Sequence, residues 1–497
     1  MRVNRAWLGL AVLMLPTLLV AMDMTALLLA LPQLSADLGA TNVQQLWISD
    51  SYGFVMAGLV ITMGTLGDRI GRRRLLMIGG AAFAVLSIVA AFAVSPLMVI
   101  VARGLLGLAG ATLMPSTLAL ITNMFRDDRQ RGQAIAVWAT CQFTGGALGP
   151  VLAGLLLQHF WWGSVFLVAV PAMVVLLLAG PFLLPEFRSD QAGRLDPTSV
   201  GLSLAAVVLT VYGIKQLTIE SETTMPTVAL VVGAAIGVLF VRRQLRLDLP
   251  LLDLRLLRSR PFTAVLVGLV FAGIAMAGTG LLVTQYLQGV LGFSPIASAV
   301  LFAPMGVGVA VGTMAAPTLA RRMQQTTVIA GGLVISAVGS LLLVTVGTSR
   351  ASGLPLVMAG IAVLALGTGP LFALGTSLVV GSVPPERAGS AASMSETGNY
   401  FGGSLGLALI GVVAAVVYRS RMDGTSDSLA DVIAAGQHRS EGQHPVVLHD
   451  AREAFTASLH VTGAVAAVIF VGLTVLVLTM RPERRVEPAG RVRQEAS

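Results

Sequence analysis

Long apolar runs alternate with short polar segments along the whole chain. At ~1.5 Å per helical residue, each run is long enough to cross the ~30 Å hydrocarbon core of a bilayer. The pattern predicts an all-α integral membrane protein with fourteen spanning helices, and because this number is even, both chain ends lie on the same side. The predicted spans are residues 6–32, 45–66, 75–95, 97–122, 133–157, 162–184, 199–219, 226–242, 262–287, 295–319, 326–348, 354–381, 390–417 and 456–480.

The basic residues between the runs indicate which side this is. With the N-terminus inside, 25 of the 32 Lys and Arg residues fall in inner segments and 5 in outer loops. Cytoplasmic loops of membrane proteins carry an excess of Lys and Arg. We therefore expect a multi-pass membrane protein with both termini in the cytoplasm. The same bias explains the net charge of +8 without a nucleic-acid partner.

Composition excludes several other classes of protein. The 497 residues are 55% hydrophobic and 11% charged, which is too apolar for soluble domains of this size. The single cysteine, Cys141, excludes an internal disulfide and a multi-cysteine metal site. No nucleotide-binding loop of the G-x-x-x-x-G-K-S/T type occurs, and no catalytic triad or metal-ligand spacing stands out. We therefore expect no enzyme activity, no cofactor and no metal.

A weak internal repeat suggests how the helices are grouped. Gly64-Thr65-Leu66 precedes an arginine pair, and Gly312-Thr313-Met314 precedes another about 250 residues later. This offset is longer than six helices require, so we predict two six-helix bundles with two extra helices between them. Parallel six-helix repeats are a known transporter plan, with the substrate site between the halves. The predicted divisions are an N-terminal bundle at 1–190, the extra helices and an inner linker at 191–261, a C-terminal bundle at 262–480 and a tail at 481–497.

Two polar segments have a distinctive composition. Residues 250–258 alternate apolar and charged positions, which suits a short amphipathic piece on the inner membrane surface. The outer segment 418–455 is predicted as a long loop and holds three of the five histidines, His438, His444 and His449. A metal site is conceivable there, but we favour a solvated loop.

Acids inside apolar runs are the main candidates for function, because a charge within the bilayer is costly. Asp23 lies in the first run, and the alternative is a helix-end acid facing water or a neighbour. Glu396 is the one acid in the second-half runs, with Asn399 and Tyr400 at helical spacing beside it. The alternative is a glutamate that snorkels to the inner surface. Asp50 is the weakest candidate, because water can reach the outer third of the second run.

The loop after the second run has a more particular pattern than ordinary inner-loop charge. It reads Gly64-Thr65-Leu66-Gly67-Asp68-Arg69-Ile70-Gly71-Arg72-Arg73-Arg74. This resembles the signature loop of the major facilitator superfamily, which latches the two halves of the transporter together. The resemblance implies a gating role for Gly64, Asp68, Arg69, Gly71 and Arg72.

Two further stretches resemble motifs of the same superfamily. Arg103-Gly104-Leu105-Leu106-Gly107 is similar to its intramembrane arginine motif, and a buried arginine needs an acid or carbonyl partners. We expect Asp23 to be that partner. The stretch 145–154 resembles the antiporter motif of its drug exporters, through Gly145, Gly149, Pro150 and Gly154. Small residues of this kind let helices approach closely, and the proline kinks the helix. The resemblance favours export over uptake.

The first two runs resemble the fourteen-helix branch of the superfamily. Asp23-Met24-Thr25 and Gln45-Leu46-Trp47-Ile48-Ser49-Asp50-Ser51-Tyr52 are similar to the quaternary-ammonium and dye exporters of that branch. The resemblance covers nearly the whole chain and is densest over 20–190. It implies a proton-coupled multidrug antiporter that exports lipophilic cations by alternating access. The tenth run lacks an acid that the branch often carries, which argues against divalent cations as substrates.

The expected site follows from these residues. A cationic drug and a proton would compete for a buried acid, and we leave open which acid takes which. We expect a monomer whose partners are small cationic drugs, protons and the lipid bilayer. Two alternatives stay open, a dedicated exporter of one antibiotic or natural product and a proton-coupled importer. The residues expected for coupling or cation binding are Asp23, Asp50, Arg103 and Glu396, with Met24, Trp47, Asn399 and Tyr400 lining the pocket.

Overall fold

The computed structural model describes residues 3–188, 196–216, 224–247, 250, 254–381, 388–422, 429, 432–433 and 444–479. All regular elements in this part of the chain are helical. They are α1 (Val3–Leu38), α2 (Asn42–Ile70), α3 (Arg72–Ala91), α4 (Pro96–Met124), α5 (Asp128–Leu157), α6 (Ser164–Leu167), α7 (Ala169–Leu183), α8 (Pro197–Gln216), α9 (Thr224–Arg246), η1 (Leu254–Arg258), α10 (Arg260–Gln285), η2 (Tyr286–Val290), α11 (Pro295–Leu301), α12 (Ala303–Leu319), α13 (Gln325–Leu343), α14 (Arg350–Pro370), η3 (Leu371–Gly375), α15 (Thr376–Gly381), α16 (Ala388–Arg421) and α18 (His444–Leu478).

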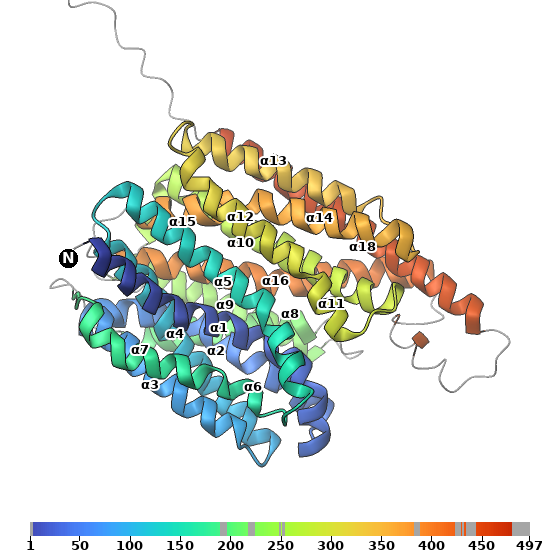
Figure 1. The fold of residues 1–497 in the computed structure, drawn as a ribbon, viewed down its shortest axis with the longest axis horizontal. Coiled ribbons are helices and arrows are strands. Elements are labelled where there is room, and N and C mark those ends of the chain that lie inside the picture. Colours follow the sequence, from blue (N-terminus) through green and yellow to red (C-terminus); the bar gives the residue numbers. More distant parts are fainter. Residues whose placement is uncertain are drawn as a thin grey trace, which may run out of the picture.

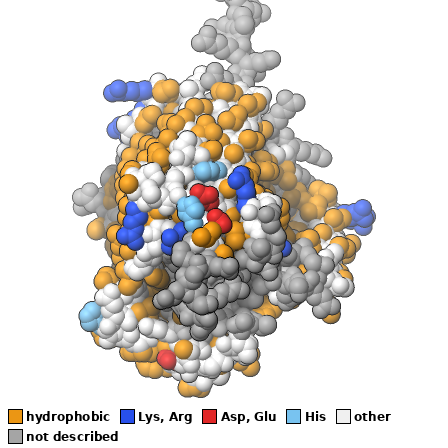
Figure 2. Space-filling model, turned by 90° about the vertical axis from the view of Figure 1, so that its right-hand side faces the viewer, with side chains coloured by type: hydrophobic (Ala, Val, Ile, Leu, Met, Phe, Trp, Pro, Cys, Tyr) orange, Lys and Arg blue, Asp and Glu red, His pale blue; other side chains and the backbone are white. Residues whose placement is uncertain are grey.

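Fourteen helical segments have the length and hydropathy to cross a membrane, which confirms the predicted number. Hydrophobic side chains cover much of the flanks of the molecule (Figure 2), where a bilayer would meet them. Four spans are less regular than predicted, and the sixth is split into α6 and α7 at Val168. The tenth is split into α11 and α12 at Phe302, and η2 and η3 are π-helical turns at the ends of α10 and α14. Such turns are frequent at functional sites.

The helices form two bundles with separate hydrophobic cores. One core is built from residues between Ala6 and Leu184, and the other mainly from residues between Phe262 and Val477. In Figure 1 the first bundle is blue to teal and the second yellow to red. The extra helices α8 and α9 pack on each other, and α8 also packs on α2. The predicted plan of two six-helix bundles plus two helices is therefore confirmed.

The halves meet mainly where α5 packs on α12 and where α16 packs on α2 and α4. Small residues make the first contact close. A Cβ on Gly306 would lie 2.8 Å from the methyl group of Ala147, and the hydroxyls of Thr140 and Thr313 are hydrogen-bonded. This places α5 between its own bundle and the opposite half.

The predicted outer loop 418–455 is too long. Helix α16 continues to Arg421 and α18 begins at His444, so both ends of the predicted loop are helical. The helical backbone hydrogen bonds continue beyond the apolar runs, because polar side chains that face solvent are compatible with a helix. His449 faces Glu453 one turn later, with Nε2 and Oε1 3.4 Å apart, and His438 lies outside the described residues. Within the described ranges, no three metal-ligating side chains gather.

Candidate functional site

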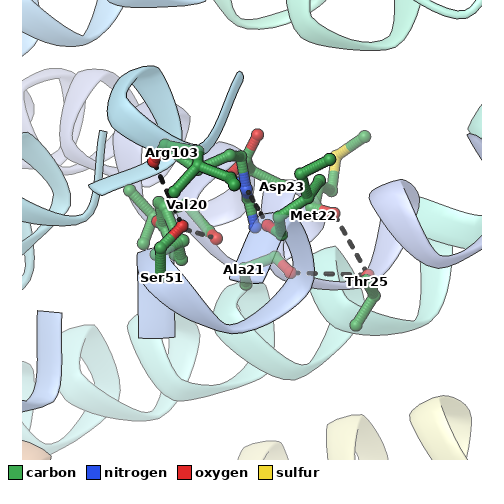
Figure 3. Close-up of polar contacts among 10 residues, drawn as sticks. Val20, Ala21, Met22, Asp23, Thr25, Ser51 and Arg103 are labelled. Carbon is green, nitrogen blue, oxygen red and sulfur yellow. Dashed lines mark hydrogen bonds and ion pairs between the residues drawn. The ribbon is translucent and has the colours of Figure 1, made fainter. Parts of the chain in front are cut away.

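Asp23 on α1 and Arg103 on α4 form a buried ion pair, as predicted. Arg103 Nη1 donates to Asp23 Oδ2, and the two side chains are 1% and 10% exposed. The Arg103 Nε donates to the Ile48 carbonyl at 3.3 Å. The pairing and its neighbours are drawn in Figure 3. Helix α1 thus presents its acid from within the helix to the adjacent helices of its own bundle. Asp23 is neither at a helix end nor facing water, but the pairing with a neighbour that the alternative allowed is present, and the functional role stays a prediction.

A tyrosine completes the surroundings of the arginine. The guanidinium carbon of Arg103 lies 4.5 Å from the ring centroid of Tyr52, within cation–π range. Tyr52 is fully buried, and its hydroxyl donates to the Val20 carbonyl at 3.4 Å. A charge at this depth needs several partners, and Arg103 has an acid, a carbonyl and a ring.

The glycines of the antiporter motif pack α5 against the turn of α1 that carries Asp23. A Cβ on Gly145 would lie 2.4 Å from the Leu18 carbonyl oxygen, and one on Gly149 would lie 2.7 Å from that of Met22. Gly154 faces Ile296 of the opposite half. Pro150 lies inside the continuous α5 helix. The motif therefore brings α1 and α5 together around the acid.

Glu396 on α16 is buried at the interface between the halves. Its residue exposure is 2%, which excludes the snorkelling alternative in this structure. The Gln142 Nε2 of α5, in the opposite half, donates to Glu396 Oε2 at 3.2 Å. Sequence reasoning missed Gln142, since the signal for it is only a neutral amide within an apolar run.

A small cavity surrounds the Glu396 carboxylate. It has room for about one water molecule. Its lining carries no charged side chain besides Glu396 and consists of Trp138, Ala139, Gln142, Phe143, Leu269, Phe372, Thr376, Ser395, Glu396 and Asn399. The predicted neighbour Asn399 thus lies beside the acid. Tyr400 packs against the core of the first bundle.

The other predicted pocket residues are more scattered. Met24 is partly buried against Gly53 of α2. Trp47 is 36% exposed and stacks on Tyr212 of α8, with ring centroids 6.0 Å apart, so its ring faces the extra helices. Asp50 lies one turn after Trp47 on α2 and is partly buried. The structure therefore assembles two centres, one at Asp23 and one at Glu396.

The signature loop folds onto the end of α7. Asp68 pairs with Arg72 one turn later, and the Arg73 amide donates to Glu186 Oε1 at 3.1 Å. Gly71 forms the turn with φ +112°, a backbone conformation that favours glycine. A Cβ at this position would lie 2.6 Å from Glu186 Oε1. Gly64 is buried in α2 and Arg69 is exposed. These contacts join the loop to its own half.

Comparison with known proteins decides the family. The sequence profile of the Major Facilitator Superfamily matches residues 13–407. The chain belongs to this superfamily. Its helical plan also matches the solved human organic anion transporter MFSD10, with a TM-score of 0.62 at 14% identity over 96% of this chain and 100% of that one. The chain is therefore a multi-pass membrane protein of a transporter family.

Its relatives include drug exporters. The chain is 39% identical to the multidrug efflux pump LfrA of Mycolicibacterium smegmatis, over 95% of this chain and 96% of that protein. It is 32% identical to the methyl viologen resistance protein SmvA of Salmonella typhimurium, over 94% and 98%. Other relatives carry the names of antibiotic resistance and export proteins.

Proposed function

We propose that this protein is a proton-coupled multidrug antiporter that exports lipophilic cations across the bacterial cytoplasmic membrane, with both termini in the cytoplasm. The observation that carries the proposal is the pair of buried acids, one in each half of a transporter fold. The name of the relative LfrA, a multidrug efflux pump, supports efflux of several compounds, whereas the relatives named for puromycin and tetracenomycin C support the alternative of one antibiotic. The basic loops support the orientation.

The surroundings of the two acids suggest different ligands. The cavity at Glu396 admits about one water, which suits a proton and excludes a drug in this arrangement. A buried carboxylate without a cationic partner is costly when ionised, so binding a proton stabilises it. We assign proton binding to Glu396.

Asp23 lies beside a larger, apolar space than the cavity at Glu396. It borders a narrow pocket between α1, α5, α6 and α7, which shares Leu19, Met22, Leu152 and Val168 with a wider groove. The groove has a volume of about 430 Å³ and an apolar lining, and drug-sized sites span ~300–1,000 Å³. We assign the cation to Asp23, with its apolar body in the groove, where the drug competes with Arg103 for the carboxylate.

Transport in this scheme requires the halves to separate and close again. The contacts between α5 and α12 include the close approach of Gly306 to Ala147 and the hydrogen bond between the hydroxyls of Thr140 and Thr313. Such contacts can break when the halves separate and form again when they close. We assign Gly64, Asp68, Arg69, Gly71 and Arg72 of the signature loop to gating of this movement. A proton entering through ~100 mV supplies ~2.3 kcal/mol, and each pH unit adds about 1.36 kcal/mol.

Ethidium uptake by inverted membrane vesicles with an acidic interior tests the proposal. We expect the parent to accumulate ethidium until a protonophore collapses the gradient. Glu396→Gln removes the response to the gradient and Asp23→Asn raises the KM for ethidium. Glu453→Gln, at an acid whose side chain is 61% exposed, serves as the acid control. Parent-level accumulation in both Asp23→Asn and Glu396→Gln would contradict the coupling role. Uptake of methyl viologen in the same assay tests whether a doubly charged cation is accepted.

A further inference from the structure

The small cavity around the Glu396 carboxylate is the space through which a proton bound there would leave. Helix α5 supplies one wall of this cavity, and α10, η3, α15 and α16 of the opposite half supply the others. The rings of Phe143 and Phe372 pack on each other across this boundary, with centroids 4.5 Å apart. Because Glu396 is 2% exposed, its proton reaches solvent by way of groups in the lining.

Most polar groups of the lining are unsuited to pass a proton on. The indole N–H of Trp138 is a donor only, and it already donates to Thr117 Oγ1 at 3.1 Å. The Gln142 amide donates to Glu396 Oε2 at 3.2 Å. In a side-chain amide, as in Gln142 and Asn399, the donor and the acceptor are different atoms. An amide that gains a proton on oxygen and loses one from nitrogen therefore does not return to its starting form.

Two hydroxyls in the lining, those of Thr376 and Ser395, are suited to this task. A hydroxyl donates and accepts at one oxygen, so it can take up one proton, release its own and remain a hydroxyl. The oxygens Thr376 Oγ1 and Ser395 Oγ are hydrogen-bonded at 3.5 Å, and the two residues are 4% and 1% exposed. They form a buried pair that borders the same cavity as the Glu396 carboxylate.

This hydroxyl pair lies close to two helix ends. Helix α15 ends at Gly381 and α16 begins at Ala388, on the cytoplasmic side in the proposed orientation. At ~1.5 Å per helical residue, Thr376 is ~8 Å and Ser395 ~10 Å from these ends. Thr376 directly follows the π-helical turn η3, and Phe372 of this turn lines the cavity. Such turns are frequent at functional sites.

We infer that Thr376 and Ser395, with one water molecule in the cavity, relay the proton of Glu396 towards the cytoplasm. The O–H bond of the Glu396 carboxyl breaks as the water oxygen takes up its proton, and the water passes one of its own protons to Thr376 Oγ1. Thr376 gives its hydroxyl proton to Ser395 Oγ, and Ser395 releases its own towards the ends of α15 and α16. Glu396 is left as a carboxylate, while the water and both hydroxyls keep their composition. The inference rests on the proposed function and names the path of its proton.

Substitution of the hydroxyls tests the relay, because it changes how fast the proton leaves and not whether Glu396 binds one. Thr376→Val removes the hydroxyl at nearly the same volume, Thr376→Ser keeps it, and Ser395→Ala removes its partner. Thr462→Val is the matched control. Thr462 of α18 is also fully buried, and its hydroxyl donates to the Ser458 carbonyl of its own helix at 2.9 Å.

The measurement is the rate of proton release after ethidium is mixed rapidly with the purified full-length transporter, followed with a pH indicator. A positioned proton-transfer group typically contributes ~10²–10⁴-fold to a rate, so we expect Thr376→Val and Ser395→Ala to release protons at least about tenfold more slowly than the parent. The amount released and the Kd for ethidium should stay parental. Thr376→Ser and Thr462→Val should release protons at the parental rate.

The outcomes separate this inference from the proposed function. Release at the parental rate from Thr376→Val or from Ser395→Ala overturns the relay and leaves the antiporter proposal standing. Slow release that Thr376→Ser does not restore, or equal slowing in Thr462→Val, also overturns the relay, because packing would then set the rate. If Thr376→Val does not fold, Ser395→Ala decides. A parent that releases no proton overturns the proposed function and the relay together.

Discussion

The charged residues in the bilayer region are held by few, specific contacts, so single substitutions have large effects. Arg103 has three kinds of partner, and its guanidinium geometry serves all of them. Lysine keeps the charge but cannot reproduce two separate N–H directions and a planar face. The function of this residue therefore depends on shape as well as on charge.

For Arg103→Lys we expect ethidium kcat/KM to fall by about 10- to 100-fold, because hydrogen bonds to charged groups are worth ~1.5–3 kcal/mol. Transport assays in proteoliposomes measure this. Arg74→Lys is the control, since the Arg74 side chain is 71% exposed. A smaller loss in Arg103→Lys than in Arg74→Lys would argue against the role assigned to the pair.

The sequence identified the charged members of the site because charge inside an apolar run is rare and costly. Asp23, Arg103 and Glu396 were found in this way. Gln142 was not, since a neutral amide in a membrane helix carries no comparable signal. Only the packing of α5 against the opposite half brings that amide to Glu396. Trp47 shows the converse, because an aromatic residue near an acid in sequence faces α8 in space.

At the scale of elements, α5 is the helix that links the site to the rest of the molecule. One face packs its glycines on α1, and another contacts α12 and α16 residues of the opposite half. The glycine motif predicted close packing of α5 but did not indicate which helices it packs against. The structure shows that these are α1 in its own half and α12 and α16 in the opposite half.

Substitution of Gly149 tests the close approach of α5 to α1. The added methyl group of Gly149→Ala would lie 2.2 Å from Thr25 Oγ1 and 2.7 Å from a carbonyl oxygen, so we expect destabilisation by ~1–3 kcal/mol and loss of efflux. Thermal unfolding of the purified protein and ethidium efflux are the measurements. Gly146→Ala on the same helix meets nothing within 4 Å and should be neutral. Equal stability of the two variants would contradict the packing account.

An ion pair joins the two extra helices where α8 begins and α9 ends. Arg243 Nε and Nη2 donate to the two Asp196 oxygens at 2.6 and 3.1 Å. These hydrogen bonds, with two from the hydroxyl and the amide of Ser199, lower the pKa of Asp196. A carboxyl whose pKa is lowered in the folded state stabilises the fold at pH values above its usual pKa of ~3.9. This stabilisation is lost as pH falls below that value and through the lowered pKa of the folded state.

We therefore expect Asp196→Asn to lower the thermal unfolding midpoint at pH 7 but to match the parent at a pH well below the usual Asp pKa. Efflux at pH 7 should stay close to parental, since the pair lies in the extra helices. Unfolding midpoints of the two proteins across this pH range provide the test. A difference that persists unchanged at low pH would show that the effect is not ionic.

At the scale of the whole molecule, the bilayer itself made the fold predictable. Spanning segments must satisfy their own backbone hydrogen bonds, so apolar runs of sufficient length become helices. The fourteen spans and the two bundles followed from this and from the repeat. The π-helical turns, the split at Phe302 and the helical start of α18 at His444 did not, because they depend on local packing and on polar residues outside the apolar runs.

Movement of the halves can be tested by locking them. Thr140 and Thr313 have hydrogen-bonded hydroxyls, so a cysteine at each position in a Cys141→Ala background brings two thiols within bonding distance. We expect oxidation to stop ethidium efflux and reductant to restore it, while either single cysteine has no effect. Parental efflux from the cross-linked protein would exclude separation of α5 from α12 during transport.

The central claim is that a cation binding at Asp23 displaces a proton from Glu396. Its most direct test is the release of protons when ethidium is added to the purified transporter in weakly buffered detergent solution, followed with a pH indicator. We expect release from the parent and from Glu453→Gln, a variant of an exposed acid, and none from Glu396→Gln at an ethidium concentration that saturates it. Equal release from Glu396→Gln, or no release from the parent, would contradict the account.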